Sequence, residues 1–145
     1  MWSTNINPIA HAIAGAAIVD KPTLDKLRLG ELAAIDAVTR GLGTIQDWKT
    51  LADMLNIAET MGLNGIGPEV LPHCEQLTKS MIEAAERYQK TRKLGLPGEG
   101  IKALKEVYEY HDLQRTSISR SVYEQMIDKT WNAIKSKSCQ VIELT

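Results

Sequence analysis

Apolar residues recur at helical spacing along most of this sequence, and that recurrence constrains the fold more than any other feature. One run alternates steps of four and three residues. Its members are Val70, Cys74, Leu77, Met81, Ala84 and Tyr88. This spacing places the side chains along one side of an α-helix. No stretch alternates polar and apolar residues over the length that a β-strand needs. The sequence therefore predicts an all-α fold.

Capping and turn residues divide the chain into about six predicted helices. Their expected bounds are 9–19, 23–40, 44–61, 68 or 72 to 93, 99–115, and 116 or 121 to about 135. Thr44 with Asp47 and Ser121 with Glu124 have the spacing of capping boxes at helix starts. We expect one compact domain over 1–145, with either orthogonal or up-and-down packing.

Three segments of this predicted bundle have a distinct character. The helix over 44–61 is apolar around much of its circumference, which predicts a central position. The first 20 residues are expected to form a helix rich in small residues, where another helix could approach closely. The tail over 136–145 is expected to be flexible, either frayed or paired as a short strand.

Composition limits both the core and the partners. Hydrophobic residues make up 43% of the chain and charged residues 24%, which favours a folded globular domain over disorder. There is no Phe, so the core must be built largely from Leu, Ile, Ala, Val and Met. The formal net charge of −1 argues against a strongly basic nucleic-acid-binding domain, although it permits a local basic patch.

The most apolar stretch and the cysteines indicate a cytoplasmic protein. Residues 9–19 are too few to span a bilayer, and no Lys or Arg precedes them as in a signal peptide. Cys74 and Cys139 are too few for a disulfide framework, which favours a reducing compartment. We therefore expect no membrane association.

No combination of residues with a recognisable catalytic spacing is present. The glycine-rich segment 95–100 lacks the Gly-Lys-Ser/Thr sequence of a phosphate-binding loop. His73 and Cys74 are adjacent, as are His111 and Asp112, and neighbouring side chains on a helix diverge. The prediction is a non-enzyme without catalytic, cofactor-binding or metal-binding residues. An enzyme whose site is assembled only by the fold is a less favoured alternative.

Two kinds of surface are candidates for binding a partner. Apolar faces at Met54, Ile57 and Met61, and at Met81, Ile82 and Ala85, could exceed what one small bundle covers. A basic cluster from Arg87 to Lys93 also lies at the C-terminal end of the predicted helix that ends at residue 93. It either complements the helix dipole or contacts a partner. The predicted partner-binding residues are Arg87, Lys90, Arg92, Lys93, Glu109 and Asp112.

A spaced set of residues gives the chain a resemblance to known proteins. The set comprises Leu27-Arg28 through Arg40-Gly41, Gly43-Thr44, Asp47, Leu51, Asn56 to Glu59, Gly65 to Gly67, Gln76, Leu104, His111-Asp112 and Gln114. Over roughly residues 27–130, the chain is similar to small uncharacterised helical proteins of proteobacterial prophages and mobile elements. This resemblance implies no catalytic residues.

The resemblance implies a functional context. Small phage-borne proteins without catalytic motifs often bind and inhibit host machinery, and anti-CRISPR proteins are one such class. We therefore expect a protein-binding module that docks on a host protein or nucleoprotein complex, such as a CRISPR–Cas effector, and blocks its contacts. The alternative is a small helical DNA-binding regulator that uses the region from Trp48 to Met61, which faintly resembles part of a helix-turn-helix.

Overall fold

The computed structural model describes residues 19–136 of the chain. Within that range the protein consists of five α-helices and one short 3-10 helix, with no β-strand, which confirms the predicted all-α class. They are α2 (Lys21–Thr39), α3 (Ile45–Leu63), η1 (Pro68–Val70), α4 (Leu71–Thr91), α5 (Gly98–Thr116) and α6 (Arg120–Lys135). The predicted N-terminal helix, the C-terminal tail and Cys139 lie outside the described residues.

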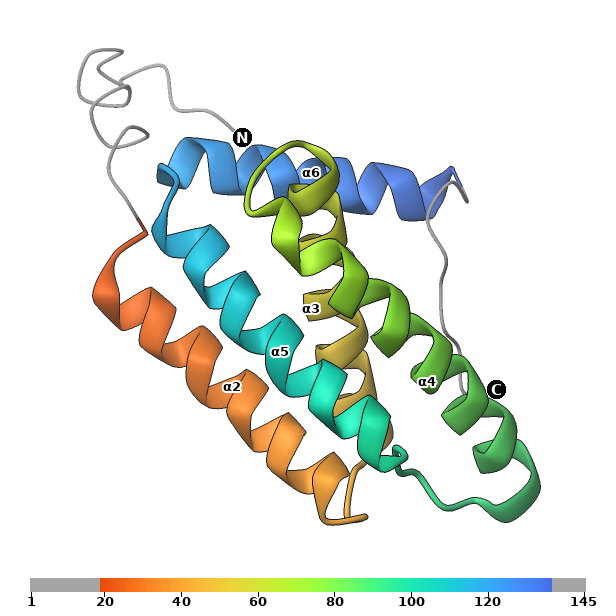
Figure 1. The fold of residues 1–145 in the computed structure, drawn as a ribbon. Helices are drawn as coiled ribbons and strands as arrows, with labels where there is room; N and C mark the ends of the chain where they lie inside the picture. Colours follow the sequence, from red (N-terminus) through yellow and green to blue (C-terminus); the bar gives the residue numbers. More distant parts are fainter. Residues whose placement is uncertain (1–18, 137–145) are drawn as a thin grey trace, which may run out of the picture.

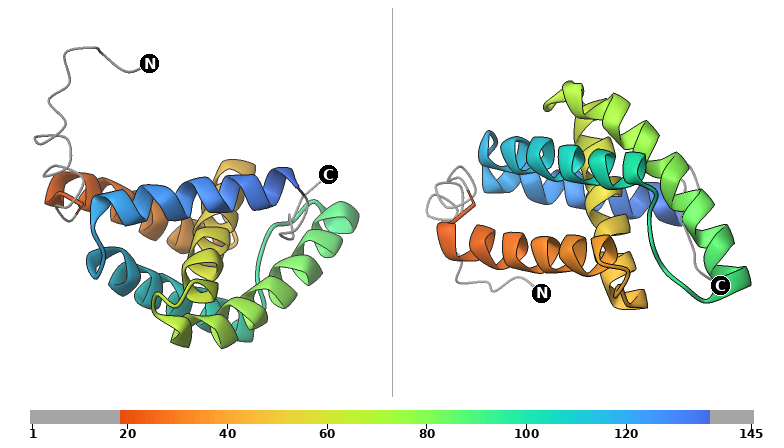
Figure 2. Two further views of the ribbon diagram at one scale, coloured as in Figure 1. Left: turned by 90° about the horizontal axis from the view of Figure 1, so that it is seen from above. Right: turned by 60° about the horizontal axis from the view of Figure 1, so that its bottom comes forward.

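Helix α3 lies at the centre of the bundle, as its wide apolar face predicts. It packs against α2, α4, α5 and α6. In Figure 1, the axes of α2, α5 and α4 are roughly aligned across the molecule, with the chain direction of α5 opposite to that of the other two, while α3 and α6 cross them. The further views in Figure 2 show the same crossing arrangement. The buried residues of α3 include Trp48, Leu51, Met54, Leu55, Ala58 and Met61.

The helix starts follow local capping chemistry. Thr44 accepts a hydrogen bond from the Asp47 backbone, and the Asp47 carboxylate accepts one from the Thr44 backbone, which confirms the predicted capping box. The prediction for α6 is wrong in detail. Ser119 caps this helix, because its Oγ accepts the Val122 N–H at 3.2 Å, and Ser121 lies inside the first turn.

Helices α4 and α5 form an antiparallel pair, and a glycine lies where the start of α5 approaches α4. A Cβ atom at Gly100 would lie 2.7 Å from Cβ of Ser80, closer than real side-chain contacts. Gly100 therefore allows the first turn of α5 to approach α4. Cys74, Leu77, Met81 and Ala84 lie along one side of α4 and are buried in the main core, so this part of the predicted seam is confirmed.

In the described residues, the fold covers most of the two apolar faces that the sequence offers as candidates for exposure, and Ile57 and Ile82 are partly buried. Met54, Met61 and Met81 are all buried, and so is Ala85. The neighbouring helices cover these faces because α3 is surrounded and α4 packs on both α3 and α5. None of the helices in residues 19–136 is both long enough and apolar enough to cross a bilayer.

Candidate functional site

The C-terminal end of α4 is basic, and its backbone turns sharply at Arg92. Arg92 has φ 57°, a left-handed conformation that is uncommon for residues other than glycine. Its N–H donates to the Tyr88 carbonyl at 2.8 Å, which closes the helix. The Arg92 guanidinium lies over the Tyr88 ring, 5.5 Å from its centroid. This turn holds Arg92 against the end of α4.

The segment after Arg92 folds back along the helix end. Leu94 is buried in the main core and anchors the loop. Arg87 donates from Nη2 to the Gly95 carbonyl at 3.3 Å, and the Lys93 N–H donates to Thr91 Oγ1 at 3.2 Å. Lys90, Arg92 and Lys93 stay exposed. Buried leucine and backbone contacts thus hold a group of cations at the surface.

The connection between α2 and α3 lies across from this basic helix end. Gly41 follows α2 with φ 74°, as expected for a residue just past a helix C-terminus. The next residues expose apolar side chains: Leu42 is 71% exposed and Ile45 is 52% exposed. Large aliphatic side chains that remain this exposed beside cations are candidates for contact with another molecule.

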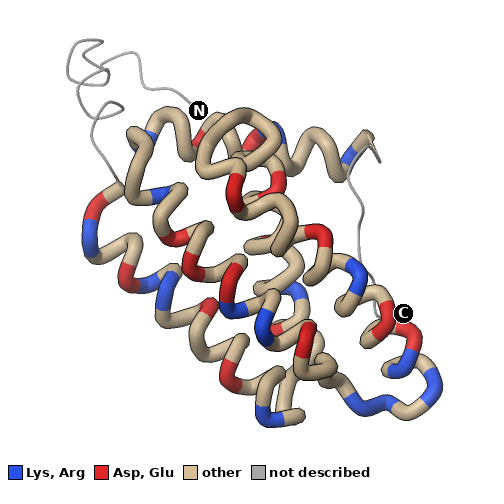
Figure 3. The backbone as a smooth tube through the Cα atoms, viewed as in Figure 1, with Lys and Arg blue, Asp and Glu red and all other residues tan. Residues whose placement is uncertain are grey.

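These two segments line an open surface hollow of about 980 Å³. We call it the end hollow; it is lined by residues 41–45 on one side, and by Arg87, Tyr88 and residues 91–97 on the other. Of the residues that line it, three are cationic and none is Asp or Glu. Figure 3 shows Lys and Arg positions gathered where α4 ends. The end hollow therefore combines positive charge with exposed aliphatic surface.

The predicted partner-binding residues do not form one site. Arg87, Arg92 and Lys93 line the end hollow, and Lys90 lies exposed on the last turn of α4. None of these four forms an ion pair with another residue of the described range. Glu109 and Asp112 lie in the C-terminal half of α5, towards its opposite end. Glu109 is exposed, whereas Asp112 is only partly exposed.

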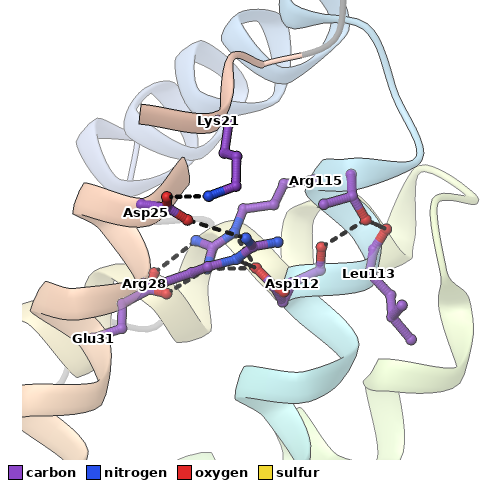
Figure 4. Close-up of polar contacts among 8 residues, drawn as sticks. Lys21, Asp25, Arg28, Glu31, Asp112, Leu113 and Arg115 are labelled. Carbon is purple, nitrogen blue, oxygen red and sulfur yellow. Dashed lines mark hydrogen bonds and ion pairs between the residues drawn. The ribbon is translucent and has the colours of Figure 1, made fainter. Parts of the chain in front are cut away.

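Asp112 belongs to a network of charges that joins α2 to α5. The fully buried Arg115 donates to both carboxylate oxygens of Glu31, at 2.6 and 2.9 Å. Asp112 Oδ1 accepts from Arg115 Nε at 3.1 Å and from Arg28 Nε at 2.8 Å. Figure 4 shows the network continuing along α2 to Asp25 and Lys21. Asp112 therefore stabilises the packing of two helices.

The charges of this network stabilise one another inside the fold. Burial opposes ionisation of Asp112, but hydrogen bonds from Arg28 and Arg115 outweigh burial and lower its pKa. Burial likewise disfavours the Arg115 cation, but Glu31 and Asp112 reverse this and raise its pKa. Paired charges with their hydrogen bonds satisfied are the form in which buried ions are tolerated.

His111 is held by a glutamine rather than by its neighbour Asp112. Its Nδ1 lies 2.9 Å from Oε1 of Gln114, and its side chain is 1% exposed. Burial and the positive charge of Arg115 lower the pKa of His111. The ring is therefore buried on the core side of α5. The predicted poor placement of Asp112 for orienting His111 agrees with this geometry.

Sequence reasoning missed the Glu31–Arg115 pair. The two residues are 84 positions apart, so no local spacing links them. The i, i+3 spacing of Asp112 and Arg115 is the only local signal, and such pairs are common on solvated helix surfaces. In the part of the chain that the structure describes, no three His, Cys, Asp or Glu residues are grouped as a metal site.

No family model, curated protein or solved structure matches this chain. The resemblance to small proteins of mobile elements rests on the spaced residues quoted above, and it stays a prediction. The surface features of this fold are therefore the basis for inferring function.

Proposed function

We propose that this protein is a non-catalytic binding module whose end hollow binds an acidic segment of a partner protein. The observation that carries the proposal is the pairing of Arg87, Arg92 and Lys93 with exposed Leu42 and Ile45 around one hollow. An acidic segment with an aliphatic residue would satisfy both the charges and the apolar surface.

The chemistry of the end hollow suits a protein partner. Arginine is enriched at protein–protein contacts and among the few residues that supply most of the binding energy, and the buried centre of such contacts is more apolar than the rest of the surface. Arg92 is already ordered on Tyr88, so less side-chain entropy is lost on binding. Complementary charge speeds the encounter and suppresses binding of cationic partners.

The mobile-element resemblance gives this proposal a biological context. In that context the partner is a subunit of a host defence complex, such as a CRISPR–Cas effector, and occupancy of an acidic segment would block a contact that the complex needs. This part of the proposal rests on the resemblance alone. The binding chemistry of the end hollow stands independently of it.

A nucleic-acid-binding function would need a different surface from the one that the sequence predicts. The region from Trp48 to Met61 lies within the central helix α3, and its buried apolar side chains argue against its entering a DNA groove. A nucleic-acid partner would have to use the cations of the end hollow. The exposed Leu42 and Ile45 favour a protein, because phosphate contacts need no aliphatic surface.

The test is capture of partners from a nuclease-treated bacterial lysate by the tagged full chain. The disabling variant is Arg92→Glu/Lys93→Glu. The matched control is Lys79→Glu/Lys105→Glu, which makes the same change in net charge at exposed residues of α4 and α5 that do not line the hollow. We expect stoichiometric recovery of one protein complex with wild type and control, and its loss with the disabling variant.

Two results would overturn the proposal. Recovery that is equal for both variants would place the contact elsewhere on the surface. Recovery that occurs only before nuclease treatment, and that falls steeply with salt, would support the nucleic-acid alternative.

A further inference from the structure

A second hollow opens on another side of the bundle, between α2 and α6. Both helices pack on α3, and the space between them has a volume of about 460 Å³. We call it the side hollow. Its walls are mainly apolar and include Leu27, Met54, Ile57, Tyr123, Ile127 and Trp131. Trp131 is 37% exposed at this opening.

The buried His111 lines the side hollow from α5. The orientation of the Gln114 amide decides which nitrogen of the His111 ring carries the hydrogen. The Gln114 amide nitrogen donates to the carbonyls of Ala58 at 3.1 Å and of Ile66 at 2.8 Å. Its Oε1 must therefore face His111 Nδ1, and an amide oxygen only accepts hydrogen bonds. Nδ1 thus carries the hydrogen.

The opposite nitrogen of the ring is then a hydrogen-bond acceptor. Burial and the charge of Arg115 lower the pKa of His111, so the ring is neutral and Nε2 carries a lone pair. No side chain or backbone group of residues 19–136 hydrogen-bonds to Nε2. A ligand in the side hollow that donates one hydrogen bond can pair with this nitrogen.

The charged residues at the side hollow favour an uncharged ligand. The Glu31 carboxylate lines it but already accepts two hydrogen bonds from Arg115. Lys26 and Asp53, of opposite sign, also line it. The volume lies within the range of small-molecule sites, in which apolar walls surround a few polar groups.

We propose that the side hollow binds a small, uncharged, largely aromatic molecule that donates one hydrogen bond to His111 Nε2. The apolar walls supply the area for the ring system, and the acceptor nitrogen of His111 selects for a donor such as a ring N–H or a phenolic O–H. The side hollow shares no residue with the end hollow, so this proposal can be tested independently of the proposed function.

Gly30 provides a way to block the site without damaging the fold. It lies in α2, lines the side hollow, and has open space where a Cβ would be. Gly30→Leu would project into the hollow, whereas Gly30→Ala adds one methyl group and serves as the matched control. Both substitutions raise helix propensity, so both variants are expected to fold.

The probes are indole and 1-methylindole, titrated into the ¹⁵N-labelled full chain and followed by amide chemical shifts. Indole has the ring N–H and 1-methylindole lacks it. We expect saturable indole shifts at residues around the side hollow, with a Kd below about 1 mM. The hydrogen bond to Nε2 predicts roughly tenfold weaker binding of 1-methylindole. Gly30→Leu would abolish the indole shifts and Gly30→Ala would retain them.

Several results would overturn the proposal. Equal affinity for the two probes would remove the role of Nε2. Indole binding that survives in Gly30→Leu, or that shifts residues elsewhere, would place the ligand in another location. Absence of binding, with nuclear Overhauser contacts between Trp131 and residues 1–18, would show that the chain itself occupies the side hollow.

Discussion

Arginine has opposite roles in two regions of this molecule. Arg115, near the C-terminus of α5, is fully buried and makes paired hydrogen bonds with Glu31. Arg92, beyond the end of α4, is exposed, lies on Tyr88 and has no carboxylate partner among the described residues. The two regions lie towards opposite ends of α5, a helix about 28 Å long.

The difference separates a cation that holds the fold from cations that are available to a partner. A buried guanidinium is tolerated only with its charge neutralised, so Arg115 has no capacity left for another molecule. The exposed cations contribute little to folding, because solvent screens them. We therefore expect substitutions in the two regions to separate cleanly into losses of stability and losses of binding.

The largest expected effect is the loss of Arg115. Arg115→Met leaves the buried Glu31 carboxylate without its partner, so we expect the free energy of unfolding to fall by about 3–5 kcal/mol. Urea denaturation followed by circular dichroism measures this loss. The double substitution Glu31→Leu/Arg115→Met is expected to recover much of the stability, because no unpaired charge stays buried between α2 and α5.

A matched single substitution sharpens the test of this region. Arg28 also binds Asp112, but its side chain is 29% exposed. Arg28→Met is therefore expected to destabilise the protein much less than Arg115→Met. If the two substitutions cost the same, or if Arg115→Met is nearly neutral, the buried pair does not hold α2 and α5 together.

The next effect in size is the pH dependence contributed by His111. Its pKa in the folded protein is lowered from the ordinary 6.5, so the unfolded chain binds the proton first as pH falls. Stability is therefore retained above pH 6.5 and lost as pH falls from 6.5 towards the folded pKa, with a slope of up to about 1.4 kcal/mol per pH unit.

The variant His111→Gln isolates this contribution. Burial raises the pKa values of Asp53 and Glu59, which act in the opposite sense at lower pH and are common to both proteins. Denaturant titrations at pH 5.5, 6.5 and 7.5 are expected to show a smaller slope for the variant. Parallel slopes for wild type and variant would mean that His111 titrates normally.

A smaller effect on stability is expected from substitutions that test the left-handed backbone conformation of Arg92. Both Arg92→Gly and Arg92→Ala remove the stacking on Tyr88, but only glycine adopts φ 57° without steric strain. We expect Arg92→Gly to be more stable than Arg92→Ala by about 1 kcal/mol. A more stable alanine variant would show that the end of α4 does not adopt this turn in solution.

The smallest expected effect is the reactivity of the Cys74 thiol in the folded protein. Burial, and to a lesser degree the charge of Glu59, raise the pKa of this thiol to about 12, so almost no thiolate forms at pH 8. In a Cys139→Ser background, a thiol reagent is expected to react with Cys74 only as fast as the protein opens. Rapid reaction of the folded protein would show that this part of the core is accessible.

The sequence predicts the core of this fold better than its surface. The wide apolar face from Trp48 to Met61 predicts the central position of α3, and Thr44 with Asp47 predicts its start, because both signals are local. The sequence does not decide which residue caps α6, since Ser119 and Ser121 lie in one hydroxyl-rich segment and either could be followed by a helix. Only the fold selects between them.

The candidate sites depend on contacts that no local pattern carries. The basic cluster from Arg87 to Lys93 is visible in the sequence, but its apolar counterpart, Leu42 and Ile45, is more than 40 positions away. The acceptor role of His111 depends on Gln114, whose orientation is decided by the carbonyls of Ala58 and Ile66. Such sites become apparent only when distant segments are brought together.

The most direct test of the central claim is a titration of the ¹⁵N-labelled chain with a short peptide of alternating glutamate and leucine. The account predicts saturable amide shifts at residues 41–45 and 92–97, weakened by salt and absent in Arg92→Glu/Lys93→Glu, with the Arg115 region unchanged. Shifts that spare the end hollow, or that persist in the charge-reversed variant, would contradict the assignment of these cations to a partner.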